Sequence, residues 1–86
     1  MDTKFSVALH ILTMISESKE TLSSQALATS VGTNASYIRK VIALLKNAGL
    51  IRSQQGKTGY QLTKSPKEMT LLEIYYATQE IKHIRL

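Results

Sequence analysis

The side chains in this sequence that could do chemistry are mainly cations, and they gather in the middle of the chain. The 86 residues include 11 Lys and Arg against 6 Asp and Glu, for a net charge of +5. Residues 21–67 contain no acid and carry seven of the eleven bases: Arg39, Lys40, Lys46, Arg52, Lys57, Lys64 and Lys67. A basic segment between near-neutral flanks is typical of a surface that binds a polyanion, although a solvated basic face on a small domain gives the same pattern.

Catalytic and metal-binding chemistry has no support in the sequence. We find no paired carboxylates, no nucleophile beside a base and no metal-ligand spacing. His10 and His83 lie far apart, and each fits a packing or surface position better than a ligand position. Because the sequence has no Cys, it can form no disulfide, thiolate zinc site or cysteine-ligated iron–sulfur cluster. The sequence predicts a protein that is not an enzyme and that holds no cofactor and no metal.

The length and hydropathy of the sequence indicate one small domain without a membrane span. A chain of 86 residues supports one small domain with one core. Its apolar runs are far shorter than the roughly 20 residues of a membrane span, and Met1 to Lys4 do not begin a signal peptide. These features predict a cytoplasmic protein without a membrane partner.

The first predicted helix covers residues 3–17 and has two apolar faces. The first face carries Phe5, Ala8, Leu9, Leu12 and Ile15. The second face carries Val7, Ile11 and Met14. A small domain usually buries one face of a helix, so we expect the second face to be covered by a partner element or by another subunit.

Two further helices are predicted to follow across a tight turn. Ser23 is a suitable N-cap for the first of them, and Gly32 ends it. Residues 33–34 form the turn and the next cap, and the third helix runs to about Ala48 before Gly49 ends it. Together these elements predict a helix-turn-helix.

The third helix divides into an apolar stripe and a basic stripe. The apolar stripe consists of Ile38, Val41, Ile42 and Leu45. The opposite stripe consists of Ser36, Arg39, Lys40, Ala43, Lys46 and Asn47. Ordinary surface helices often carry Glu–Lys pairs four residues apart, and this helix has none. Their omission favours an anionic partner.

A hairpin and a fourth helix complete the predicted domain. Strands are predicted over residues 50–54 and 60–63, joined by a glycine-bounded loop. Ser65-Pro66 breaks the chain, and a capping box over residues 70–73 begins the fourth helix. The apolar surface of that helix comes from Leu71, Leu72, Ile74, Tyr75 and Tyr76. The predicted fold is mainly α with a small β-hairpin, a winged helix-turn-helix.

This order of elements suits double-stranded DNA, because the major groove admits one α-helix and a hairpin beside it can reach the backbone or the minor groove. We expect Arg39 to contact a base, since arginine can donate two parallel hydrogen bonds to guanine, and Lys40 and Lys46 to neutralise phosphates. Tyr37 either flanks the core or contacts DNA through its hydroxyl. The predicted DNA-binding residues are Thr33, Asn34, Ser36, Tyr37, Arg39, Lys40, Lys46, Arg52, Gln54, Lys57 and Thr58.

Two other functions fit a winged helix less well here. A protein-interaction module that never contacts DNA would display an exposed apolar patch on the third helix or the wing, and those surfaces are basic and polar in this sequence. RNA binding ranks lower still. Sequence-specific RNA-binding proteins usually present aromatic platforms on a sheet, and this hairpin offers little beyond Tyr60.

Several stretches of the sequence resemble the Rrf2 family of bacterial winged-helix regulators, which includes IscR, NsrR and CymR. They are residues 5–12, 36–40, 44–50, 59–62 and 69–75. The most specific of them is the glycine-bounded wing followed by a Thr-Leu-Leu-Glu-Ile helix, and the cysteine-poor YwnA-like branch is the most similar.

The resemblance implies a homodimeric regulator, usually a repressor, that binds a near-palindromic operator through the third helix and the wing. It assigns base contacts to Ser36, Tyr37 and Arg39, and the wing to residues 54–59. Family members continue after the fourth helix into a long dimerisation helix. The resemblance therefore implies that residues 1–86 are the DNA-binding domain without that helix. It does not identify the operator or a small-molecule effector.

Overall fold

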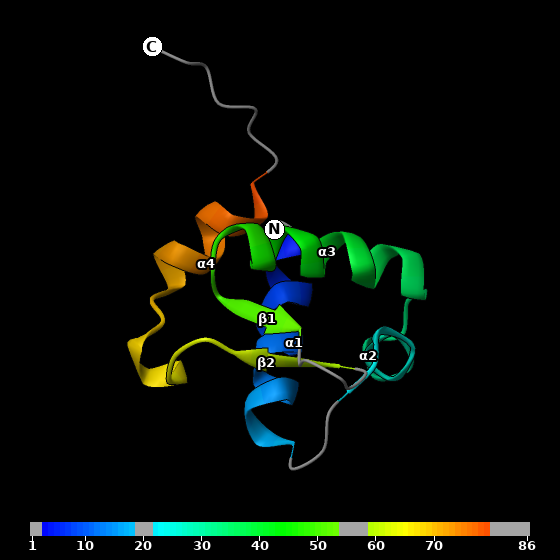
Figure 1. Cartoon of the computed structure of the whole chain (residues 1–86). Coiled ribbons are helices and arrows are strands. Elements are labelled where there is room, and N and C mark those ends of the chain that lie inside the picture. Colours follow the sequence, from blue (N-terminus) through cyan, green and yellow to red (C-terminus); the bar gives the residue numbers. More distant parts are fainter. Residues whose placement is uncertain (1–2, 19–21, 54–58, 80–86) are drawn as a thin grey trace.

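The predicted winged helix-turn-helix is confirmed by the computed structural model, which describes residues 3–18, 22–53 and 59–79. Within these ranges, α-helices pack together and a two-stranded antiparallel hairpin lies on one side of them (Figure 1). In chain order, the elements are α1 (Thr3–Glu17), α2 (Ser24–Val31), α3 (Ala35–Asn47), β1 (Ile51–Ser53), β2 (Tyr60–Leu62), the 3₁₀ helix η1 (Pro66–Glu68) and α4 (Leu71–Thr78).

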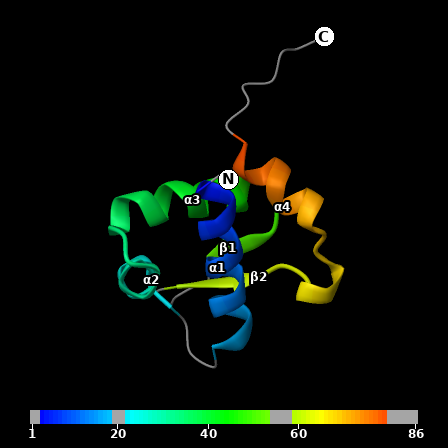
Figure 2. The same ribbon diagram turned by 180° about the vertical axis from the view of Figure 1, so that it is seen from behind.

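The helix α1 runs through the middle of the molecule, with α2 on one side and α4 on the other (Figures 1 and 2). It packs against α2, α3, β2 and α4 of the same chain. Val7 and Ile11, which belong to the face that we expected a partner element or another subunit to cover, are consequently buried. Of the two alternatives, elements of the same chain rather than another subunit cover these two residues, because a helix enclosed on several sides buries more than one face.

The hydrophobic core lies where α1 meets the helix-turn-helix formed by α2 and α3. Its largest fully buried aliphatic side chains are Ile11, Leu27, Ile38, Val41 and Leu45. On α3, the predicted apolar stripe is buried and the opposite stripe is exposed, as the helical spacing indicated. The core therefore fixes which face of α3 is presented to solvent.

The predicted ends of α2 and α3 are also confirmed. The Ser23 side chain caps α2 by accepting a hydrogen bond from the backbone N–H of Ala26 at 3.1 Å. The Asn34 Oδ1 atom caps α3 by accepting from the N–H of Tyr37 at 2.8 Å. Between these helices, Gly32 adopts a left-handed conformation with φ 85°, which makes the tight turn.

The C-terminal end of α3 reverses the chain toward the hairpin. Gly49 has φ 78°, and its N–H donates to the carbonyl of Lys46 at 2.9 Å. The N–H of Leu50 donates to the carbonyl of Leu45 at 3.0 Å, which completes a Schellman motif. Leu50 therefore belongs to the helix end rather than to the strand in which we predicted it, and it is buried.

Substitution of Gly49 by alanine is expected to lower the free energy of unfolding by about 1 kcal/mol, because L-residues are strained at positive φ. A Cβ atom at this position would have no heavy atom within 4 Å beyond the adjacent residues, so the cost is conformational. Urea denaturation measures it. Gly49→Asn is the control, since asparagine tolerates this conformation better, and it should recover part of the loss. Equal losses in both variants would contradict the backbone explanation.

The hairpin is short and fastened to α3. Its register pairs Ile51 with Leu62, Arg52 with Gln61 and Ser53 with Tyr60. After β2, the Thr63 hydroxyl donates to the carbonyl of Gly49 at 2.6 Å, and its N–H donates to the carbonyl of Leu50 at 3.1 Å. Both ends of the hairpin are thereby attached to the end of α3.

The segment after the hairpin contains an element that the sequence did not predict. Ser65-Pro66, which we interpreted as a break, instead begins η1, and the Ser65 hydroxyl accepts a hydrogen bond from the N–H of Lys67 at 3.2 Å. Proline fits the first turn of a helix because the N–H that it lacks would have no intrahelical partner there. The chain between β2 and α4 therefore contains a short helix where we expected only a break.

The predicted capping box of α4 is present and is joined to the hairpin by an ion pair. The Thr70 hydroxyl accepts from the N–H of Glu73 at 3.0 Å, and Glu73 Oε2 accepts from the N–H of Thr70 at 2.9 Å. The other carboxylate oxygen, Oε1, accepts from Lys64 Nζ at 2.6 Å. One carboxylate thus caps α4 and attaches it to the chain that leaves β2.

These contacts predict a pH dependence of stability. The side-chain hydrogen bond from Lys64, followed by the backbone hydrogen bond from Thr70, holds the pKa of Glu73 below its ordinary value of 4.5. A carboxyl group whose pKa is lower in the folded state contributes stability that is fully present above pH 4.5 and is lost as the pH falls through the folded pKa.

Glu73→Gln is therefore expected to lower the Tm at neutral pH, by an amount that shrinks as the pH falls below the unfolded pKa of the carboxyl group. Thermal melts of both proteins over a pH series measure the difference. Glu68→Gln, at an exposed acid on η1, controls for the change in net charge. A wild-type advantage that persists unchanged in strong acid would contradict this role of Glu73.

Candidate nucleic-acid interface

The exposed stripe of α3 brings the predicted basic residues together on one surface. Arg39, Lys40 and Lys46 are all exposed, and Ser36 lies exposed one turn before Lys40. The core anchors the opposite stripe, so these side chains share one outward-facing side of the helix. We call the surface made by Ser36, Arg39, Lys40, Ala43, Lys46 and Asn47 the basic face.

Arg39 lies near the start of α2 as well as on the basic face. Its Nη1 atom donates to the Ser24 hydroxyl at 3.4 Å, which is long for a hydrogen bond and therefore weak. A guanidinium group has five N–H donors in a planar fork, so this contact leaves donors for another partner. The bidentate geometry that guanine recognition requires remains available to Arg39.

Lys46 connects the basic face to the wing. Its Nζ atom donates to the hydroxyl of Ser53 on β1 at 3.1 Å. The neighbouring residue on the strand, Arg52, is exposed. The last turn of α3 and the start of the wing are therefore in contact, and each carries an exposed cation.

Sequence reasoning missed both serines, Ser24 and Ser53. Each is near its cation only because the helices and the hairpin fold together, 15 residues from Arg39 in one case and 7 residues from Lys46 in the other. Neither contact has a local spacing pattern that could have revealed it.

Three predicted residues at the turn have structural roles. Asn34 is exposed, but its Oδ1 atom caps α3, so only the amide nitrogen is left to donate elsewhere. Thr33 is half-buried, and its N–H donates to the carbonyl of Ala28 at 3.0 Å. Tyr37 is half-buried and packs against the core, which supports the first of the two alternatives for its ring. DNA contacts by all three remain predictions.

The wing was predicted to contribute four DNA-binding residues. Arg52 lies on β1, but Gln54, Lys57 and Thr58 lie outside the described residues, so their contacts also remain predictions.

The acids of the described segments lie away from the basic face. Glu17 is at the end of α1, Glu68 is in η1 and Glu73 is in α4. Lys64, which the sequence grouped with the central bases, pairs with Glu73 and belongs to the α4 side. The first turns of α2 and α3 contain no acid to offset the positive ends of their helix dipoles. The electrostatic field of α2, α3 and β1 therefore attracts anions.

A helix-turn-helix with a basic second helix and an attached hairpin defines a winged-helix protein of the DNA-binding type. The chain belongs to the Rrf2 family, because the family's model, described as an iron-dependent transcriptional regulator, matches residues 1–85. The resemblance noted from the sequence is thus confirmed.

Individual relatives agree with this assignment. YwnA of Bacillus subtilis (strain 168) is described as an HTH-type transcriptional regulator. It is 41% identical to this chain over 80 residues, which cover 93% of this chain and 59% of YwnA. A crystal structure described as a DNA-binding protein is 40% identical, with a TM-score of 0.85, covering 95% of this chain and 70% of that one. Staphylococcus aureus CymR is 28% identical, with a TM-score of 0.81, covering 96% of this chain and 70% of CymR. The chain thus spans about three fifths of YwnA.

The family description includes iron, but the donors in the described part of the chain do not form an iron site. The sequence contains no cysteine. Among the residues that the structure describes, no three His, Asp or Glu side chains come together to hold a metal ion.

The helices of the described residues differ in length and hydropathy from a membrane span. Within residues 3–18, 22–53 and 59–79, no helix has the length and apolar character needed to span a bilayer.

Proposed function

We propose that this chain is the DNA-binding part of a bacterial transcriptional regulator, acting in the cytoplasm as a repressor, with α3 in the major groove and the wing beside it. The observation that carries the proposal is the basic face of α3, which is acid-free, exposed and held outward by the core. Membership of the Rrf2 family supports the same function.

Within this proposal, the side chains divide between affinity and specificity. Arg39 donates to a base edge, whereas Lys40, Lys46 and Arg52 neutralise phosphates. The contact between Lys46 and Ser53 supports a combined action of the helix and the wing, because it places β1 beside the last turn of α3.

We propose further that the protein works as a homodimer, which a two-fold symmetric operator would require. The support is the exposed apolar surface of α4, where Leu71 is 65% exposed, Leu72 59%, Tyr76 64% and Tyr75 43%. Apolar side chains clustered in this way commonly mark a protein–protein contact. Sedimentation equilibrium tests the dimer, and a monomer at high concentration would contradict it.

Salt dependence of binding to random-sequence duplex DNA tests the proposed function. With three phosphates neutralised by Lys40, Lys46 and Arg52, the logarithm of the binding constant should fall against the logarithm of salt concentration with a slope of about −3 per protomer. Binding that is undetectable at low salt would instead favour a protein-interaction module, for which the apolar surface of α4 is the available contact.

A further inference from the structure

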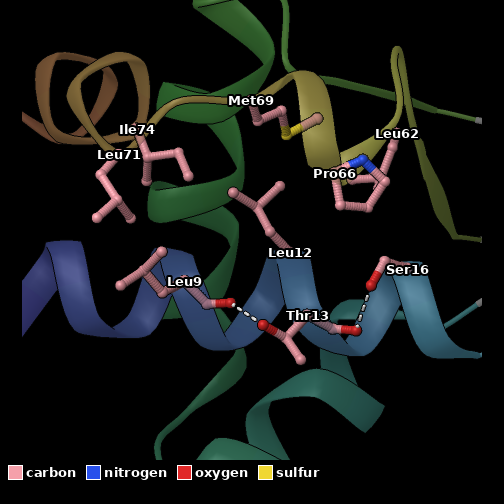
Figure 3. A pocket seen from close by; sticks show the side chains of 9 residues that line it. All are labelled: Leu9, Leu12, Thr13, Ser16, Leu62, Pro66, Met69, Leu71 and Ile74. Atoms are coloured by element: carbon pink, nitrogen blue, oxygen red, sulfur yellow. Dashed lines mark hydrogen bonds between the residues drawn. The ribbon is translucent and has the colours of Figure 1, made fainter.

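A pocket outside the DNA-binding surface lies between α1 and the segment that runs from β2 through η1 to α4 (Figure 3). Its volume is about 200 Å³. Leu12, Met69 and Ile74 converge in its interior, with Pro66 and Ser16 at one end (Figure 3). Seven of its nine lining residues are apolar, and the other two are Thr13 and Ser16.

The two hydroxyl groups of the lining already donate their protons within α1. The Thr13 hydroxyl donates its proton to the carbonyl of Leu9 at 2.8 Å, and the Ser16 hydroxyl donates to the carbonyl of Thr13 at 2.9 Å. A hydroxyl has one proton to donate but two lone pairs, so each oxygen can still accept. Any hydrogen bond between these groups and a bound molecule must therefore be donated by that molecule.

The lining also limits the charge and the size of a ligand. None of the nine lining residues is charged, so the pocket offers an ion no partner and favours a neutral ligand. An engineered apolar cavity of about 150 Å³ in another protein binds benzene, which indicates that this pocket can hold a ring with a substituent.

We propose that the pocket binds a small neutral molecule with a hydrocarbon body and one O–H or N–H donor, of the size and chemistry of a phenol. The body packs among Leu12, Met69 and Ile74, and the donor reaches Thr13 or Ser16. This assignment of a ligand site does not depend on DNA binding.

The regulatory consequence does rest on the proposed function. Leu62 lines the pocket and pairs with Ile51 across the hairpin, next to Arg52 and close to the contact between Lys46 and Ser53. A molecule wedged between α1 and Leu62 therefore acts on the base of the wing. Through that position, an occupied pocket changes the affinity of the regulator for DNA.

Phenol and toluene are the probes that test the ligand site, since they share a ring and differ in the donor. Each is titrated into the ¹⁵N-labelled chain, and the shifts of backbone amide resonances give two Kd values. We expect saturable shifts confined to α1, β2 and the segment from η1 to α4. The double variant Thr13→Val, Ser16→Ala should reduce the ratio of phenol affinity to toluene affinity by about three- to tenfold, the value of one hydrogen bond.

The matched control is Thr29→Val on α2, outside the pocket. The Thr29 hydroxyl donates to the carbonyl of Gln25 at 3.1 Å, the same contact that Thr13 makes on α1. This variant should leave the ratio unchanged. Ser16→Leu, which fills the end of the pocket near Pro66, should abolish the binding of both probes.

Three results would overturn the proposal. They are the absence of saturable shifts at the pocket, a ratio that is the same in the double variant and the wild type, and phenol binding that disappears as the protein dimerises. The last result would assign the pocket to a second copy of the chain. DNA binding with no phenol binding would refute the ligand site alone, whereas phenol binding with no DNA binding would refute the proposed function alone.

Discussion

Arg39→Ala is expected to reduce the preference for a selected operator over scrambled DNA by about 1–3 kcal/mol, or roughly 5- to 150-fold. The reason is geometric. Arg39 is exposed on the basic face in the first half of α3, and its weak 3.4 Å contact with Ser24 leaves donors of the planar fork for two parallel hydrogen bonds to guanine. Binding isotherms on an operator enriched from a random pool, and on its scrambled counterpart, measure the change.

Three variants provide the controls for Arg39. Arg39→Lys keeps the charge but loses the fork, so it should lose specificity while retaining the salt dependence. Lys40→Ala and Lys46→Ala should weaken binding to both sequences alike and reduce the salt slope by about 1 each. If Arg39→Ala and the two lysine variants all had equal effects on both DNAs, the assignment of Arg39 to a base would be wrong.

Leu45→Ala is expected to destabilise the domain by about 2–5 kcal/mol, because truncation of a buried leucine loses transfer free energy and leaves a cavity. Leu45 lies on the buried side of α3 and is fully buried, and its carbonyl accepts the hydrogen bond that closes the Schellman motif. Small domains have only about 5–15 kcal/mol of stability in total, so a large share of the molecules could unfold near physiological temperature. Urea denaturation measures the loss.

The matched control is Leu72→Ala, which makes the same chemical change at a side chain that is 59% exposed on α4. Its effect on monomer stability should be within about 0.5 kcal/mol of zero. DNA binding by Leu45→Ala should recover when measured on the folded fraction, since the basic face is unchanged. Similar losses for the two leucine variants would contradict the burial assigned to α3.

Local chemistry made much of this fold predictable. The side chains of Ser23 and Asn34 cap their helices with short-range hydrogen bonds, and Gly49 ends α3 in a conformation that glycine favours. The periods of the apolar residues correctly indicated which stripe of α3 is buried. These features depend on residues within a few positions of one another, so a single sequence contains them.

Features that depend on tertiary packing were less predictable. The sequence left open whether another element or another subunit covers the second face of α1, and the structure shows Val7 and Ile11 buried by elements of the same chain. The basic stripe of the candidate site was predicted residue by residue, whereas the contacts of Ser24 and Ser53 were not. Such contacts arise when separate elements come together, and no spacing in the sequence encodes them.

The most direct test of the central claim is to map which residues a DNA duplex contacts. In an NMR titration with an enriched operator, we expect the largest shift changes and intermolecular contacts at Ser36, Arg39, Lys40 and Lys46 on α3, continuing to Arg52 on β1. The exposed side of α4 should change little at a protein concentration where the oligomeric state is constant. Contacts concentrated on α4, with the basic face of α3 unaffected, would contradict the account.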